Sequence, residues 1–135
     1  MKLFLKLNAL SMLFAFVFFI GIQLIGNVYR LSRITGIGLD RMNISILIVD
    51  AGIVVLCTIA FHLILKHKLT SRKANYWCTL LWLPYFFMFT FLFVSLFPIT
   101  NPGEQLPPAA GLMIIAGVLI FPLYLTLVIW WAHSD

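Results

Sequence analysis

The residue with the clearest chemical potential is Asp50, because it lies inside a long apolar run, residues 44–65. An ionised carboxylate in hydrocarbon is costly, so it needs a partner, a proton or water. One hypothesis is a proton- or cation-coupled site, or a ring of carboxylates lining a pore in an oligomer. The other is a buried acid that pairs with an arginine or an amide and fixes helix register. Polar residues within reach favour this structural interpretation.

The partners expected for Asp50 are Gln23 and Asn27, near the end of the preceding apolar run. At about 1.5 Å per helical residue, Asp50 and Gln23 should lie about 10 Å and about 9 Å from the same membrane surface. At about 100° per residue, Gln23, Asn27 and Arg30 share one helix face. We expect this face to meet Asp50, with Arg30 or Arg33 reaching down from the membrane rim.

Other residues offer less chemistry. A haem could be held by His62 and His133 if their imidazoles faced each other, since both are expected toward the cytoplasmic side. A packing histidine and a solvated one are the simpler interpretation, and no spacing of Cys, His and Asp matches a metal site. Cys57 and Cys78 are expected to be free thiols. With no nucleophile–base pair and no glycine-rich phosphate loop in the sequence, we expect neither enzyme activity nor a cofactor.

Four apolar runs must position these residues. The chain is 63% hydrophobic and 10% charged, whereas soluble domains average about 45–50% apolar and about 25% charged residues. Continuous runs near twenty residues are typical of helices rather than barrel strands. The first run is longer than the apolar part of a signal peptide, so we expect it to stay uncleaved. The predicted fold is an all-α, polytopic membrane protein, a four-helix bundle in one domain, with transmembrane helices at 7–28, 44–65, 76–97 and 109–131.

Basic residues predict the orientation of this bundle. Six Lys and Arg residues flank the spans on the side of the termini, against three on the other side. By the positive-inside rule, both termini are cytoplasmic. The three on the unfavoured side, Arg30, Arg33 and Arg41, suggest that partners hold them. The formal net charge of +5 gathers at the ends of the spans, which indicates contact with lipid headgroups rather than nucleic acid.

The segment 66–73 is the candidate for contacts outside the bundle. Its basic residues could bind anionic lipid or dock a cytosolic partner, although a loop that only sets topology is the simpler interpretation. These residues are Lys66, Lys68, Arg72 and Lys73.

The leading functional hypothesis is a small non-enzymatic membrane subunit that acts by homo-oligomerisation or by association with a larger complex. Accessory, regulatory, immunity or defence components of the bacterial cytoplasmic membrane have this size and class. One alternative is a small ion- or proton-coupled channel or transporter that uses Asp50 with Gln23. A second alternative is a membrane anchor for a redox partner, binding haem or quinone near His62.

Overall fold

The computed structural model describes residues 1–69 and 71–134. Two residues of predicted segments, Thr70 in the basic segment and Asp135 at the C-terminal end, lie outside the described residues. The described residues form helices joined by short connections and contain no strand. The predicted all-α class is therefore confirmed.

Four helices are each long and apolar enough to cross a membrane, as the four apolar runs predicted. The first and second of them begin five residues before the predicted apolar runs, because hydropathy marks the apolar part of a helix and misses its polar turns. The long helices are α1 (Lys2–Gly26), α3 (Leu39–Lys68), α5 (Cys78–Leu96) and α6 (Pro108–Ala132), and the short α4 (Arg72–Asn75) leads into α5.

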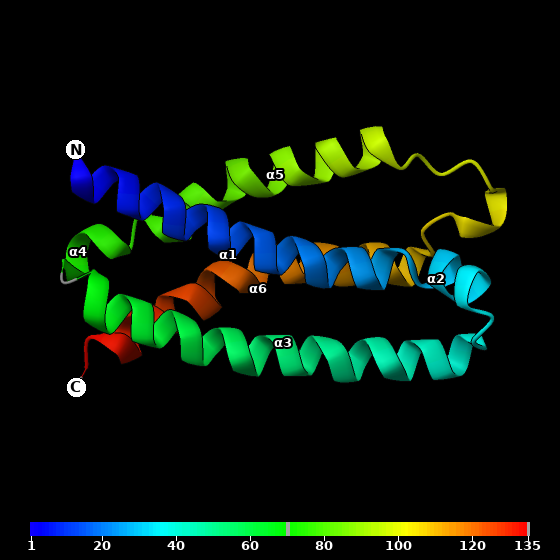
Figure 1. Cartoon of the computed structure of the whole chain (residues 1–135), viewed down its shortest axis with the longest axis horizontal. Helices are drawn as coiled ribbons and strands as arrows, with labels where there is room; N and C mark the ends of the chain where they lie inside the picture. Colours follow the sequence, from blue (N-terminus) through cyan, green and yellow to red (C-terminus); the bar gives the residue numbers. More distant parts are fainter. Residues whose placement is uncertain (70, 135) are drawn as a thin grey trace.

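Long helices that follow one another in the chain run antiparallel, so α1 is parallel to α5, and α3 is parallel to α6. In Figure 1, α1 passes between α3 and α5, and α6 lies behind them. The most extensive packing is of α1 on α5, and α6 packs on α3, α5 and α1. Both ends of the chain and α4 lie at one end of the bundle, which we call the terminal end. The opposite end carries the turns that connect α1 to α3 and α5 to α6.

The α1–α3 connection contains a second short helix, α2 (Val28–Thr35). It follows a break at Asn27, whose φ of −107° and ψ of 19° interrupt the regular helix. It ends at Gly36, which adopts a left-handed φ of 72° that glycine tolerates without a Cβ clash. The turn at Gly36 returns the chain directly into α3.

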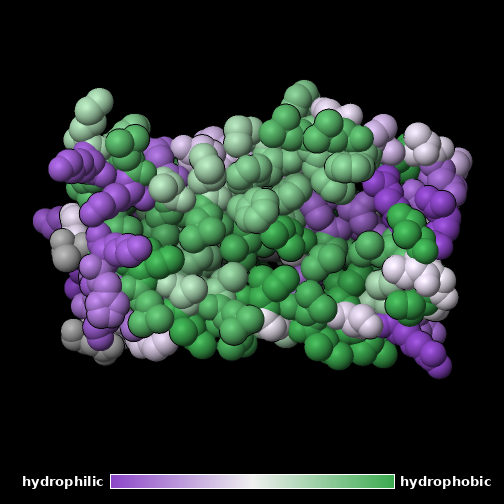
Figure 2. Space-filling model, viewed as in Figure 1, coloured by the Kyte–Doolittle hydropathy of each residue, from purple (hydrophilic) through white to green (hydrophobic). Residues whose placement is uncertain are grey.

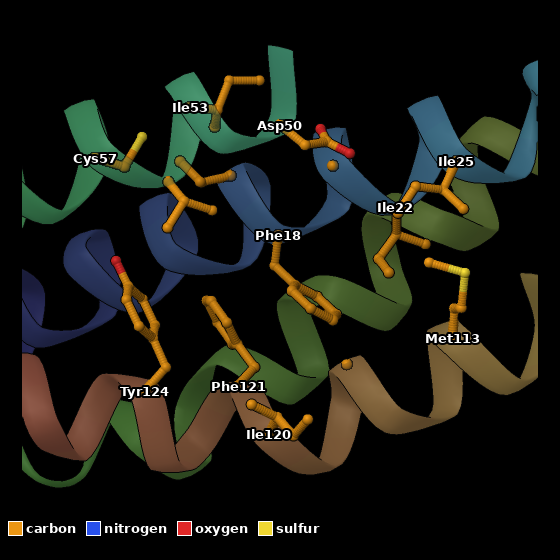
Figure 3. A pocket seen from close by; sticks show the side chains of 14 residues that line it. Phe18, Ile22, Ile25, Asp50, Ile53, Cys57, Met113, Ile120, Phe121 and Tyr124 are labelled. Atoms are coloured by element: carbon orange, nitrogen blue, oxygen red, sulfur yellow. The ribbon is translucent and has the colours of Figure 1, made fainter. Parts of the chain in front are cut away.

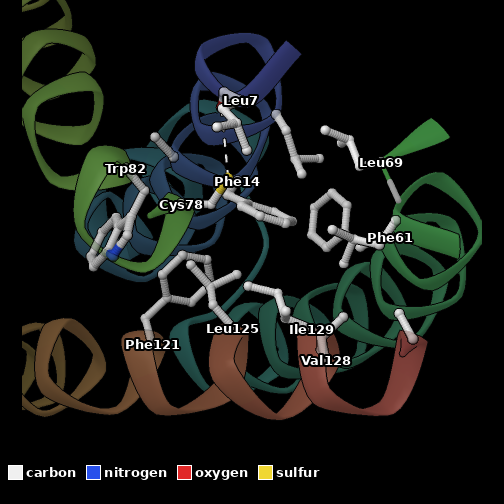
Figure 4. Packing of buried hydrophobic residues seen from close by; sticks show 14 of the residues in the cluster. Leu7, Phe14, Phe61, Leu69, Cys78, Trp82, Phe121, Leu125, Val128 and Ile129 are labelled. Atoms are coloured by element: carbon white, nitrogen blue, oxygen red, sulfur yellow. Dashed lines mark hydrogen bonds between the residues drawn. The ribbon is translucent and has the colours of Figure 1, made fainter. Parts of the chain in front are cut away.

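The dense part of the core lies toward the terminal end, and Figure 4 shows the packing of its side chains. Phe14 of α1 and Phe61 of α3 meet edge to face, with ring centroids 4.4 Å apart. Leu125 and Ile129 of α6 close the base of this cluster, and both are fully buried. Both cysteines are free, as expected, and Cys78 donates its thiol hydrogen to Leu7 O at 3.7 Å. The helices are therefore tightly packed in this half, whereas the middle of the bundle contains a cavity.

Candidate functional site

A cavity of about 350 Å³ lies in the middle of the bundle between α1, α3 and α6. Figure 3 shows side chains of these three helices converging on it. On the face shown in Figure 2, the surface is hollowed where α1 and α3 pass each other. The wall consists of Val17, Phe18, Gly21, Ile22, Ile25, Asp50, Ile53, Val54, Cys57, Met113, Gly117, Ile120, Phe121 and Tyr124.

Asp50 is the charged residue of this wall, and its carboxylate points from α3 toward α1 (Figure 3). Its Oδ1 atom is buried and has no hydrogen-bond partner among the described residues. The carboxylate rests against Gly21 of α1: a Cβ added to Gly21 would lie 3.6 Å from Oδ1. Because Gly21 has no side chain, an acid on α3 can approach the α1 backbone without filling the cavity.

Aromatic rings form the side of the cavity opposite α3. The rings of Phe18 and Phe121 are tilted with centroids 4.5 Å apart. Gly117 makes this packing possible, because a Cβ there would lie 3.3 Å from Phe18 Cζ. The Tyr124 hydroxyl is occupied: it lies 2.6 Å from Thr58 Oγ1, which itself donates to Val54 O at 2.6 Å. Asp50 therefore carries the unsatisfied polar group of the wall.

The predicted contact of Gln23 and Asn27 with Asp50 is not formed. Both amides line a different groove, of about 380 Å³, together with Phe93 of α5 and Phe97, which follows that helix. Asn27 Nδ2 donates to the Gln23 backbone oxygen at 2.8 Å and to Gln23 Oε1 at 3.0 Å. The physical reason is helical phase: Gly21 faces Asp50, and Gln23, two residues later, is rotated about 200° away.

Arg30 and Arg33 do not reach Asp50 either, so this prediction is also corrected. Arg30 Nε donates to Glu104 Oε2 at 3.2 Å, and Arg33 Nε donates to Glu104 Oε1 at 2.5 Å. Arg30 also donates to the backbone oxygens of Phe97 and Pro98, each at 3.3 Å. Glu104 belongs to η1 (Pro102–Glu104), so the cluster fastens the α5–α6 connection onto α2.

Two opposing influences act on the carboxyl group of Glu104. Burial raises its pKa, but the hydrogen bonds and positive charges of Arg33 and Arg30 outweigh this, and the pKa lies below its ordinary value. Sequence reasoning missed Glu104 as the partner. The available signal was the set of arginines on the unfavoured side, opposite a connection whose single charged residue is Glu104.

The two histidines considered for haem have separate surroundings. The His62 ring packs against Trp131, with ring centroids 4.0 Å apart and the planes tilted by 34°. His133 Nε2 lies 2.9 Å from Asn75 Nδ2, which also donates to Leu69 O at 3.0 Å. Burial, and next the positive charge of Arg72, lower the pKa of His133 below its ordinary value. The imidazole is therefore an acceptor for the Asn75 amide and joins α4 to the end of α6.

The predicted basic segment lies at the terminal end of the bundle, where Figure 2 shows a hydrophilic rim beside the apolar band. Lys66 and Lys68 are in the last turn of α3, and Arg72 and Lys73 begin α4. From α1, Lys6 Nζ donates to the backbone oxygen of Lys68 at 3.5 Å. Contact of this segment with lipid or with a cytosolic protein stays a prediction.

Comparison of the chain with protein-family models, with curated proteins and with solved structures found no match in any of the three sets. The fold defines a class, a helical protein with four candidate membrane-spanning helices. The proposals below therefore rest on the geometry of the cavity and of the surfaces around it.

Proposed function

We propose that this protein is a non-enzymatic membrane protein that takes amphipathic cations from the bilayer into the cavity between α1, α3 and α6. In this proposal Asp50 is the counter-ion and the aromatic wall holds the apolar body of the ligand. One observation carries the proposal: the buried Oδ1 of Asp50 has no hydrogen-bond partner among the described residues, in a wall that is otherwise almost entirely apolar.

The cost of an unpaired carboxylate supports a cationic ligand. In a medium of low dielectric constant, an ionised acid without a partner is strongly destabilised, so it takes up either a proton or a positive group. An organic cation satisfies the acid and fills the apolar space at the same time. Anions would meet the carboxylate in the same wall and be repelled. The charge of the carboxylate therefore selects cations over anions, and the shape of the cavity selects among cations.

The size and the rings of the cavity fit the same class of ligand. A volume of about 350 Å³ lies within the ordinary range for small-molecule sites, about 300–1,000 Å³. Phe18, Phe121 and Tyr124 present aromatic faces and edges, and aromatic rings attract cations through their quadrupole. Because a proton and a cation compete for one carboxylate, the arrangement suits proton-coupled exchange. The transporter hypothesis thus retains Asp50 as the ion-binding residue but not Gln23, which lines another groove.

Cation binding can be measured with tetraphenylphosphonium and the purified protein in lipid nanodiscs. We expect saturable binding to the wild type and at least tenfold weaker binding to Asp50→Asn, because the amide has the same shape but no charge. Asp40→Asn is the matched control, since Asp40 is exposed in the first turn of the same helix. Equal affinity of the wild type and Asp50→Asn would refute the proposal.

A second function, assembly with another subunit, is favoured by the hollow between α1 and α3 (Figure 2). A helix of a second copy or of a partner could cover this opening and donate a hydrogen bond to Asp50. Its test is the oligomeric state in mild detergent with and without tetraphenylphosphonium. Assembly predicts a dimer or larger species that Asp50→Asn weakens, and a monomer under all conditions would contradict it.

We also propose that the terminal end faces the cytoplasm of a bacterial inner membrane, on the basis of its excess of Lys and Arg. A fluorescent protein that folds only in the cytoplasm, fused after residue 135, tests this orientation. A bright fusion supports it. A dark fusion, together with an active periplasmic alkaline phosphatase fused at the same point, would reverse it.

A further inference from the structure

A second feature of the terminal end is a shallow groove of about 230 Å³ between α1 and α3. It is separate from the Asp50 cavity, and none of its wall residues is acidic. Two lysines stand among apolar side chains. The wall is formed by Lys6, Ala9, Leu10, Leu13, Ile64, Lys68 and Leu69.

Helical spacing explains why this groove exists. Residues 6, 9, 10 and 13 follow one another at intervals that keep them on one face of α1. Ala9 is the small member of that stripe, so the surface is recessed at its position. Leu10 and Leu69 form a buried floor, each with 3% of its surface exposed. From residue 6 to residue 13 the groove extends about 10 Å along the helix axis, which is long enough for part of an acyl chain.

Positive charge gathers at one end of the groove. Lys6 Nζ contacts the backbone oxygen of Lys68 at 3.5 Å, and both side chains are exposed. Lys2 lies one turn before Lys6 on the same face of α1. The ammonium groups are therefore at the rim of the bundle, where lipid headgroups lie, and the apolar floor extends from them toward the middle of the bundle.

We propose that this groove binds one anionic phospholipid, with its phosphate between Lys6 and Lys68 and one acyl chain along the leucine floor. Charge complementarity selects the headgroup, and each basic residue near a membrane surface contributes about fivefold in affinity for anionic lipid. The apolar floor favours a lipid over free phosphate, because phosphate would leave the leucines uncovered. The bound lipid would contact both α1 and α3 along the surface groove between them.

Native mass spectrometry of the detergent-purified protein tests this proposal with two probes of equal chain length, phosphatidylglycerol and phosphatidylcholine. We expect retained phosphatidylglycerol at one copy per protein and several-fold less phosphatidylcholine. Lys6→Gln and Lys68→Gln should each weaken phosphatidylglycerol binding about fivefold. Lys73→Gln is the control, because it removes one charge at the same end but lies outside the groove.

Two further arms separate the groove from general surface charge. Ala9→Leu keeps every lysine but fills the recess, so it should also lower lipid retention, while inorganic phosphate should not displace the lipid. The proposal is overturned if both lipids bind equally, or if Lys73→Gln weakens binding as much as Lys68→Gln. It is also overturned if phosphate alone displaces the lipid, or if a second protein copy occupies the groove. Unchanged melting temperatures of the variants exclude misfolding as the cause.

Discussion

Asp50 on α3 lies directly against Gly21 on α1, with Oδ1 3.6 Å from the position that a Cβ of Gly21 would occupy. Gly21 and the carboxylate of Asp50 lie side by side in the wall of the cavity. A charged residue there has no described partner, so the space beside it is suited to a ligand of opposite charge.

A larger side chain at Gly21 should therefore block the cavity. We expect Gly21→Leu to weaken tetraphenylphosphonium binding at least tenfold, because the added atoms occupy the space beside the carboxylate. Gly52→Leu is the matched control, since nothing lies within 4 Å of a Cβ built on Gly52. Affinity measured in nanodiscs decides the outcome, and full binding by Gly21→Leu would show that the ligand does not sit beside Asp50.

The aromatic cluster at the terminal end should dominate the stability of the bundle. Phe61 is 2% exposed and contacts Phe14, whereas Phe87 is 62% exposed on α5. We expect Phe61→Ala to cost about 3–5 kcal/mol of unfolding free energy. Phe87→Ala should change it by less than about 0.5 kcal/mol. Unfolding in mixed micelles with increasing denaturing detergent measures both, and similar losses would contradict the assignment of the core.

Hydropathy was sufficient to predict the four helices, because each apolar run is about as long as a membrane is thick. It could not set the helix boundaries, since polar turns such as the one that begins α3 at Leu39 continue the helix beyond the apolar run. The depth arithmetic for Asp50 pointed to the correct region of α1. Rotational phase was the missing information: it decides between Gly21 and Gln23, and it depends on tertiary packing that one sequence does not contain.

The ion-pair cluster at the opposite end should fix the α5–α6 connection. We expect Glu104→Gln to lower the melting temperature more than Asp40→Asn does, because it leaves Arg30 and Arg33 without their shared carboxylate. The pKa of Glu104 is lowered in the folded protein, so its contribution is present above about pH 4.3, the ordinary value for glutamate. This contribution to stability is lost as the pH falls through the pKa that Glu104 has in the folded protein. Thermal melts across that range should show this loss in the wild type but not in Glu104→Gln.

The contact between His133 and Asn75 predicts a second dependence on pH with the same sign. Burial and Arg72 lower the pKa of His133 in the folded protein, so the unfolded chain binds the proton more tightly. Stability should therefore fall as the pH drops below about 6.5, the ordinary value for histidine, toward the folded value. Thermal melts between pH 8 and pH 5 should show a smaller fall in His133→Gln. An identical pH profile in the variant would contradict this role.

The pairing of Glu104 with the arginines was missed for a different reason from the contact between Gly21 and Asp50. The arginines on the unfavoured side indicated that partners hold them, and Glu104 does hold Arg30 and Arg33. The acid in the facing connection was visible in the sequence. Asp50 drew attention because it lies in an apolar run, yet ion pairing at a membrane rim costs less than pairing inside it. The arginines therefore pair with the acid at their own level, and Asp50 remains in the cavity.

The central claim, that cations occupy the cavity beside Asp50, is tested most directly by photocrosslinking in nanodiscs. The probe is a lipophilic ammonium compound that carries a diazirine, and labelled residues are located by mass spectrometry. We predict labels on the facing walls of α1, α3 and α6, such as Phe18, Ile53 and Met113, that excess tetraphenylphosphonium suppresses and Asp50→Asn removes. Labels spread over the exposed face of α5, or labelling that persists in Asp50→Asn, would contradict the claim.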